Sequence, residues 1–495
     1  MMDKSGGSYY DCLNIDRTAS QEDVRDAYFS LARQYHPDVN SSPDAADRFV
    51  KIQQAYDVLS NKRKRRDYDL KYYGSEQQGD LKFSIKFSQP ALPRLDEEQM
   101  LYMMAEIAPI ITEEKLDPPP IHLCIVLDRS TSMQGSRMDM VKANLLKLVK
   151  EFREKDSLSL VTFSDRAQLV IPPGRITQPD ILEGKIAQLT TGGGTEIYRG
   201  LELGMQTVQS YGDRDTVKRL FLLTDGHTYG DEIECLELAA MSARQGIPIN
   251  ILGFGGDWND EFLDQFTKLN GGTTTFVTSR EGLYNYFTRS INEIQNTVAK
   301  NLALELGVNK RVKIESIFRM QPEIGELVTE NTIYLGNLTR KNRIRILFEM
   351  QLQPVTRIED EIMLADGFLV YDLFSGEKQQ RKKTRIAFCI PVRSSVERET
   401  PPAEIVEALA RMRLYRMQAK ARVDVEEGRY LDATRRMHNL ATHLLAQGER
   451  ELAKTVLLEM DSIQKQQGYS PEGAKQIKYG TKALLRLPEP KMRYE

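Results

Sequence analysis

The spacing of apolar residues changes several times along the chain, and each change predicts a different architecture. Residues 8–74 and residues 403–480 have apolar positions at helical spacing. Between them, the strand-like stretches 81–120 and 301–395 flank a region, 121–300, where apolar strands alternate with amphipathic helices. This pattern predicts a multidomain protein: an all-α domain, a doubly wound (Rossmann-like) α/β domain inserted in a β-sandwich, and a C-terminal segment of two or three helices.

Short segments rich in glycine, proline or polar residues separate these regions. Residues 75–80 predict a flexible linker, Pro118–Pro120 end the first strand-like stretch, and Pro401-Pro402 precede the C-terminal helices. Residues 486–495 are expected to form a loose tail. An inserted α/β domain would bring the two strand-like stretches together in one sandwich. The alternative is two unrelated β segments.

The first helical region is expected to be a pair of antiparallel helices. Ser20 and Asp23 resemble a capping box at the start of the first helix. That helix must end near His36, because Pro37 disfavours helical geometry in the residue before it. His36, Pro37 and Asp38 therefore fall in an exposed loop. The apolar faces that would pack together are formed by Val24, Ala27, Tyr28, Leu31 and Tyr35 in the first helix and by Phe49, Ile52, Ala55, Tyr56 and Leu59 in the second.

Residues 8–73 resemble the J domain of the DnaJ family. The similarity rests on the His36-Pro37-Asp38 loop together with Tyr9-Tyr10-Asp11-Cys12-Leu13, Ala27-Tyr28, Phe49, Ala55-Tyr56 and Tyr68-Asp69. It implies docking on a DnaK-type chaperone and stimulation of its ATP hydrolysis, with His36, Pro37 and Asp38 as the trigger.

The resemblance also implies a basic contact face on the helix before the loop. Here Arg25 and Arg33 would provide it. The acidic residues Glu22, Asp23 and Asp26 dilute that face, so we expect weak electrostatic steering toward an acidic chaperone surface.

Two apolar strands of the α/β region each end in an aspartate. Asp128 follows the run Ile121–Leu127, and Asp225 follows a second apolar run. Open α/β sheets bind ligands outside the carboxyl ends of their strands. Ser130 and Ser132 emerge there as well, and so does Thr195 after a glycine loop. The two carboxylates and three hydroxyls are hard oxygen donors, which suit Mg²⁺.

This set is similar to the metal-ion-dependent adhesion site of von Willebrand factor type A domains. In that family the Asp-x-Ser-x-Ser motif, a distant threonine and a distant aspartate hold the ion directly or through water. The matching positions here are Asp128, Ser130, Ser132, Thr195 and Asp225. The resemblance covers about residues 121–300. It implies Mg²⁺, or else Mn²⁺ or Ca²⁺, and an acidic side chain of a partner protein. The alternative is a type A fold whose site is idle.

The layout of a type A domain inserted in a sandwich resembles bacterial relatives of inter-alpha-trypsin inhibitor.

The composition of the chain bears on its partners and on its cellular compartment. A net charge of -3 over 495 residues gives no general attraction to nucleic acid. Four scattered cysteines fit a reducing compartment, and neither a membrane-spanning run nor a secretory signal is recognisable, which predicts a cytoplasmic protein.

No Walker lysine motif and no nucleophile-base pair is recognisable, so we expect no enzymatic activity. The favoured interpretation is a DnaJ-like co-chaperone or adaptor. It would recruit a DnaK-type ATPase and bind an acidic partner through Mg²⁺. The alternative is a metal-dependent protein-binding scaffold or assembly factor with a vestigial J domain.

Overall fold

The computed structural model divides the chain into two compact units, Met1–Lys82 and Phe83–Glu495. It describes residues 8–15, 19–36, 42, 45–61, 64–65, 68, 80–110, 118–226, 230–356, 360–375, 378–394 and 399–487. Pro37, Asp38, residues 75–79 of the expected linker and residues 488–495 lie outside these ranges. None of the helices in the described ranges combines the length and apolar composition that crossing a bilayer requires.

The first unit is a small helical domain built from α1 (Tyr9–Leu13), α2 (Gln21–Tyr35) and α3 (Ala45–Leu59). The predicted capping box is confirmed: the Ser20 hydroxyl accepts the Asp23 N–H at 3.1 Å, and the Asp23 carboxylate accepts the Ser20 N–H at 2.7 Å. The helices pack through the expected apolar faces, with Tyr28 stacked on Tyr56. The buried core of this helical domain consists of Tyr10, Leu13, Val24, Ile52, Ala55 and Leu59.

The second unit contains two five-stranded sheets, in the orders β1-β3-β14-β11-β12 and β13-β10-β15-β16-β2. Their strands come from both sides of the α/β domain, since β3 pairs with β14 and β2 with β16. The bounds are β1 Leu81–Phe87, β2 Leu92–Pro93, β3 Gln99–Pro109, β10 Thr297–Val308, β11 Val312–Gln321, β12 Gly325–Leu327, β13 Thr332–Thr339, β14 Ile344–Leu352, β15 Glu361–Ser375 and β16 Lys378–Arg393.

The two sheets pack face to face through aromatic side chains. Phe388 of one sheet contacts Phe83 and Phe348 of the other, with ring centroids 6.1 and 5.9 Å away. The predicted insertion of the α/β domain into a β-sandwich is therefore confirmed, and the alternative of two unrelated β segments is wrong. The sandwich resumes at Thr297, slightly before the expected boundary at residue 300.

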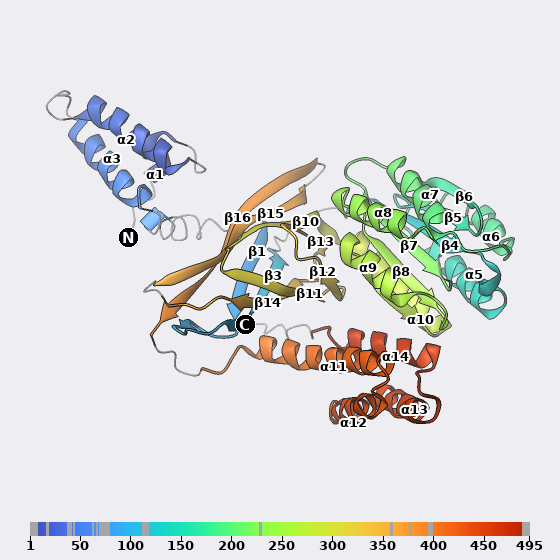
Figure 1. The fold of residues 1–495 in the computed structure, drawn as a ribbon. Helices are drawn as coiled ribbons and strands as arrows, with labels where there is room; N and C mark the ends of the chain where they lie inside the picture. Colours follow the sequence, from blue (N-terminus) through green and yellow to red (C-terminus); the bar gives the residue numbers. More distant parts are fainter. Residues whose placement is uncertain are drawn as a thin grey trace. The chain divides into compact units, whose positions relative to one another are not determined.

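The inserted domain has a six-stranded sheet in the order β6-β5-β4-β7-β8-β9, parallel except for β6 (Figure 1). One core cluster includes side chains of α5, α6 and α10, and the other includes those of α7, α8 and α9. Every residue of β4 is buried, as its apolar run predicted. The bounds are β4 Ile121–Asp128, α5 Ser136–Leu148, β5 Ser157–Phe163, β6 Ala167–Arg175, α6 Pro179–Ala187, α7 Ile197–Gln209, β7 Val217–Thr224, α8 Glu232–Arg244, β8 Ile249–Phe254, α9 Asp260–Asn270, β9 Thr274–Val277 and α10 Arg280–Gln295.

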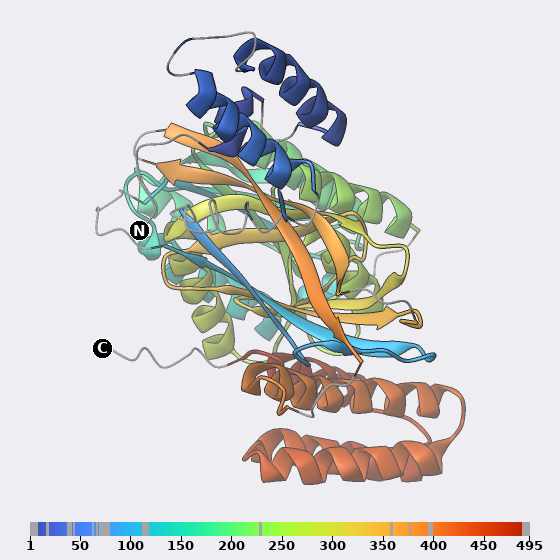
Figure 2. The same ribbon diagram turned by 90° about the vertical axis from the view of Figure 1, so that its left-hand side faces the viewer.

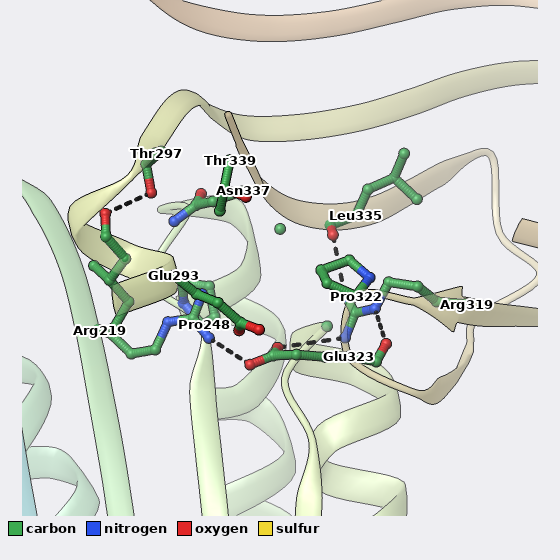
Figure 3. A pocket seen from close by; sticks show the side chains of 13 residues that line it. Arg219, Pro248, Glu293, Thr297, Arg319, Pro322, Glu323, Leu335, Asn337 and Thr339 are labelled. Carbon is green, nitrogen blue, oxygen red and sulfur yellow. Dashed lines mark hydrogen bonds and ion pairs between the residues drawn. The ribbon is translucent and has the colours of Figure 1, made fainter. Parts of the chain in front are cut away.

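A buried charged cluster joins this domain to the sandwich (Figure 3). Glu323, just after β11, accepts hydrogen bonds from Arg219 of β7 at 3.0 Å and from Asn250 of β8 at 2.9 Å. Arg319 of β11 lies 3.9 Å from the other Glu323 oxygen. The cavity beside these groups is only about 20 Å³, enough for a single water molecule. The cluster therefore fastens the two domains together and leaves no room for an organic ligand.

The C-terminal segment forms four helices, more than the two or three expected: α11 (Ala403–Glu426), α12 (Tyr430–Ala446), α13 (Arg450–Gln466) and α14 (Pro471–Ala483). The α12–α13 pair forms a second layer beyond α11 and α14 (Figures 1 and 2). The expectation of a loose tail from residue 486 is wrong for its first two residues. Leu487 is buried, and its carbonyl oxygen accepts a hydrogen bond from Gln321. The Arg486 carbonyl oxygen accepts one from Arg411.

A cluster of ion pairs holds the C-terminal helices against α9. Asp260 pairs with Arg422 of α11 at 2.8 Å and with Lys478 of α14 at 2.5 Å. Asp264 pairs with Lys478 at 2.7 Å and with Lys482 at 2.9 Å. Burial alone would raise the pKa of Asp260, but Lys478 and Arg422 outweigh it and lower the pKa to about 2.

Asp260→Asn is expected to destabilise the protein near neutral pH but not in strong acid. Because the folded-state pKa lies below the ordinary value near 3.8, the ionised pair stabilises the fold fully above about pH 4, and this contribution is lost as the pH falls toward 2. The shift of a little under two units corresponds to about 2–3 kcal/mol. Urea unfolding at a series of pH values measures the difference between wild type and variant. The control is Asp257→Asn, which changes an exposed aspartate three residues before Asp260. If the difference in unfolding free energy between wild type and Asp260→Asn does not change with pH, the ionised Asp260 does not stabilise the fold.

Candidate metal site

The candidate site lies at the carboxyl edge of the inserted sheet. Asp128 is the last residue of β4, and Asp225 directly follows β7, which pairs with β4 in parallel. Asp128, Asp225 and Ser130 are buried, whereas Ser132 is exposed. The two carboxylates therefore sit at the base of the site, and Ser132 marks its opening to solvent.

Hydrogen bonds join four of the five predicted residues directly. The Ser130 N–H donates to Asp128 at 2.8 Å, and the Ser130 and Ser132 hydroxyl oxygens are 2.9 Å apart. The Ser132 hydroxyl donates to Asp225 at 2.7 Å. One continuous network thus connects the residues of the Asp-x-Ser-x-Ser segment with an aspartate almost a hundred positions away.

The fifth residue, Thr195, lies on the loop that leads into α7. This loop is fixed to the serine segment, because the Gly192 N–H donates to the Arg129 carbonyl oxygen at 2.7 Å and the Thr131 hydroxyl donates to the Gly193 carbonyl oxygen at 3.1 Å. A Cβ atom on Gly226 would lie 3.0 Å from the Thr195 hydroxyl oxygen. Thr195 is therefore next to the residue that follows Asp225.

Burial is the largest influence on the Asp128 carboxyl group and raises its pKa to about 6. The hydrogen bonds from Thr224 and Ser130 lower the pKa, but by less than burial raises it. The Thr224 hydroxyl donates to the second Asp128 oxygen at 2.7 Å. A carboxylate whose ionised form is disfavoured by burial gains from a nearby cation. The site is thus electrostatically prepared for a positive ion.

The donor set fits a hard divalent ion. A serine hydroxyl that donates its hydrogen to a carboxylate keeps oxygen lone pairs free for coordination. Two adjacent ligands of an octahedral Mg²⁺, each at about 2.0–2.1 Å from the ion, would lie roughly 2.9 Å apart, which matches the separation of the Ser130 and Ser132 oxygens. The described residues contain no cluster of three or more His, Cys, Asp or Glu side chains suited to a metal, so the hydroxyls are needed here.

The second predicted site is the loop after α2 in the N-terminal helical domain. His36 is half-buried at the end of α2, and its ring lies edge-on to Phe49 of α3 with the centroids 5.4 Å apart. Arg25 and Arg33 are exposed on α2, and the Arg25 guanidinium lies over the ring of Phe29. Pro37 and Asp38 fall outside the described residues. The contact with Phe49 fixes the start of the loop relative to both helices.

Three family models match separate parts of the sequence. Residues 8–69 match the DnaJ domain, residues 122–292 the von Willebrand factor type A domain, and residues 403–487 the Sll0103-like C-terminal alpha-helical domain. The chain is a J domain fused to a type A domain. The third match adds a C-terminal helical domain of the Sll0103-like type.

Curated relatives cover different parts of this J-domain and type A chain. The uncharacterized protein sll0103 of Synechocystis sp. is 30% identical over 257 residues, which are 50% of this chain and 61% of that protein. The chaperone protein DnaJ of Exiguobacterium sp. is 54% identical over 61 residues, 12% of this chain and 17% of that protein. The chain thus spans less than two thirds of either relative.

Solved structures of type A proteins resemble this chain in fold. The von Willebrand factor type A protein from Catenulispora acidiphila is similar with a TM-score of 0.64 at 14% identity, covering 81% of this chain and 96% of that one. The ArnB paralog VWA2 from Sulfolobus acidocaldarius gives a TM-score of 0.54 at 13% identity, covering 82% and 98%. At these identities the likeness concerns the fold alone.

Two residues of the type A site were missed by the sequence analysis. Thr224 precedes Asp225, and its place at the end of the same strand could have identified it. Arg137, in the first turn of α5, forms an ion pair with Asp225 and donates to the Ser132 carbonyl oxygen at 3.2 Å. No sequence pattern distinguishes Arg137 from the many other basic residues of the chain.

Proposed function

We propose that this protein is a non-catalytic co-chaperone adaptor. Its J domain recruits a DnaK-type chaperone and stimulates ATP hydrolysis, and its type A domain binds an acidic side chain of a partner protein through Mg²⁺, or Mn²⁺ or Ca²⁺. The proposal places the protein in the cytoplasm with its chaperone. The observation that carries it is the presence, on one chain, of a J domain with the His36-Pro37-Asp38 loop and of a hydrogen-bonded donor set around Asp128 and Asp225.

The adaptor role follows from linking two binding modules. A partner held by the type A domain meets the recruited chaperone at an effective concentration set by the linker rather than by free diffusion. In the metal site, Asp128, Ser130 and Ser132 would hold the ion, with Thr195 and Asp225 directly or through water. The bound ion would supply a Lewis-acidic position for the partner's carboxylate.

A scaffold with a vestigial J domain is the second candidate, and the surface of α2 favours it. Arg25 and Arg33 are exposed, but so are the acidic residues Glu22, Asp23 and Asp26 on the same helix. Opposite charges close together weaken the field that would attract an acidic chaperone surface. A scaffold of this kind would still bind its partner through the type A domain.

His36→Gln is expected to abolish the stimulation of a DnaK-type ATPase by the full-length protein. His36 is only half-buried, so the fold should survive the substitution, which a melting curve checks. Single-turnover ATP hydrolysis by the chaperone is measured with wild type, His36→Gln and the matched control His438→Gln, which changes an exposed histidine on α12. The control should stimulate as wild type does. Equal stimulation by His36→Gln would reject the co-chaperone role. No stimulation by wild type would favour the scaffold.

A further inference from the structure

The metal site contains a cation of its own. Arg137 donates from one guanidinium nitrogen both to Asp225 and to the Ser132 carbonyl oxygen. The Arg137 side chain is 30% exposed, while that of Asp225 is fully buried. The Ser132 hydroxyl occupies the other Asp225 oxygen. Both oxygens of this carboxylate therefore have partners before any ion binds.

The β8–α9 segment fixes the position of Arg137. Gly255 has a φ of +68°, and a Cβ atom at this position would overlap with the Arg137 guanidinium. The guanidinium thus lies directly against backbone at a position where a side chain would collide with it. Because Asp225, the Ser132 carbonyl oxygen and Gly255 all lie against the Arg137 guanidinium, its charge is a built-in part of the site rather than a freely moving surface charge.

The positive charge of Arg137 changes the net charge of the site. The charged groups of the hydrogen-bonded donor set are the carboxylates of Asp128 and Asp225 and the guanidinium that pairs with Asp225, that of Arg137, which together carry a net charge of −1. Asp165 accepts the Gly194 N–H at the rim, but it is exposed and screened by solvent. A divalent ion alone would leave the group at +1. A single carboxylate from a ligand would return it to neutrality.

We propose that Arg137 couples the binding of the ion to that of an acidic ligand. This inference rests on the proposed metal site and names its regulation. Repulsion from Arg137 weakens binding of the ion alone, and the same positive charge strengthens binding of a carboxylate once the ion is present. By linkage, the factor by which the bound ion tightens the carboxylate is also the factor by which the carboxylate tightens the ion. The site is therefore selective for an ion and an acidic side chain taken up together.

Arg137→Gln is expected to bind Mn²⁺ alone about tenfold or more tightly than wild type. Mn²⁺ binding to the full-length protein is followed by electron paramagnetic resonance, in acetate and in chloride buffers of equal ionic strength, with acetate as the carboxylate probe. Acetate should tighten Mn²⁺ binding in wild type and in the charge-conserving variant Arg137→Lys, and much less in Arg137→Gln. Melting curves check that each variant is folded.

The outcomes separate this inference from the metal site itself. If wild type binds Mn²⁺, Asp128→Asn does not, and Arg137→Gln binds with equal or lower affinity, the coupling role of Arg137 is overturned while the site remains. If acetate acts equally on wild type and Arg137→Gln, the coupling is overturned as well. If neither wild type nor Arg137→Gln binds Mn²⁺, the proposed metal site fails, and the inference fails with it.

Discussion

Mg²⁺ is expected to raise the melting temperature of the wild-type protein, and Asp128→Asn is expected to abolish this rise. An ion that binds only the folded state at 100 times its Kd adds about 2.7 kcal/mol to the unfolding free energy. Asparagine keeps the shape of the side chain and can still accept the Ser130 N–H, while the Thr224 hydroxyl can turn from donating to accepting. The substitution therefore removes the charge with little change in packing.

The same substitution should have the opposite effect in the absence of metal. Burial raises the pKa of Asp128 to about 6, so the folded state disfavours the carboxylate. This penalty is complete above about pH 6 and disappears below about pH 4, where the group is protonated in both states. A shift of about two units corresponds to roughly 3 kcal/mol at most. With a chelator at pH 7.5, Asp128→Asn should therefore melt at a higher temperature than wild type, and at pH 4 the two should coincide.

The control for both effects is Asp139→Asn, which removes an exposed carboxylate from the first turn of α5. It should retain the Mg²⁺-dependent rise. Coincident melting of wild type with Mg²⁺ and with chelator would contradict an occupied site. Persistence of the rise in Asp128→Asn would show that the ion binds elsewhere.

Much of the fold and of the candidate metal site could be predicted, because the residue pattern within single strands and helices determines it. The apolar run of β4 requires a strand buried on both faces, and parallel strands place Asp128 and Asp225 at one edge. The Ser20–Asp23 capping box needs only residues three positions apart. The insertion of the type A domain was one of two layouts that the flanking strand-like stretches allowed, and the pairing of β3 with β14 and of β2 with β16 decides between them.

The partners of charged residues could not be predicted in the same way. Arg137 and Asp225 are 88 positions apart, and Asp260 and Lys478 are 218 apart. Which of many basic residues reaches a given carboxylate depends on how helices and loops are placed in three dimensions, and no periodicity records that. The packing of Leu487 is a similar case, since it depends on Gln321 and on the position of α11, far away in the sequence.

Glu323→Ala is expected to lower the unfolding free energy by about 3–5 kcal/mol, the usual cost of removing one partner from a buried ion cluster. Arg319 and Arg219 are 2% and 7% exposed, so without Glu323 two buried guanidinium groups would lose the carboxylate that lies between them, and Glu293 would be the acidic side chain left among the residues lining the pocket (Figure 3). Burial opposes the ionisation of Glu323, but these two arginines outweigh it and lower its pKa. Arg319 also donates to the carbonyl oxygens of Leu335 and Gly272, which keeps it in place.

The chain offers a matched control three residues later. Glu326 pairs with Lys268 of α9 at 2.6 Å and so also bridges the sandwich and the type A domain, but both side chains are more than a third exposed. An exposed pair of this kind contributes at most about 1 kcal/mol. Urea unfolding followed by the fluorescence of Trp258, the single tryptophan, measures both variants. If Glu323→Ala costs no more than Glu326→Ala, the buried cluster does not hold the inserted domain on the sandwich. Glu323→Gln, which keeps the hydrogen-bond acceptor without the charge, should fall between wild type and Glu323→Ala.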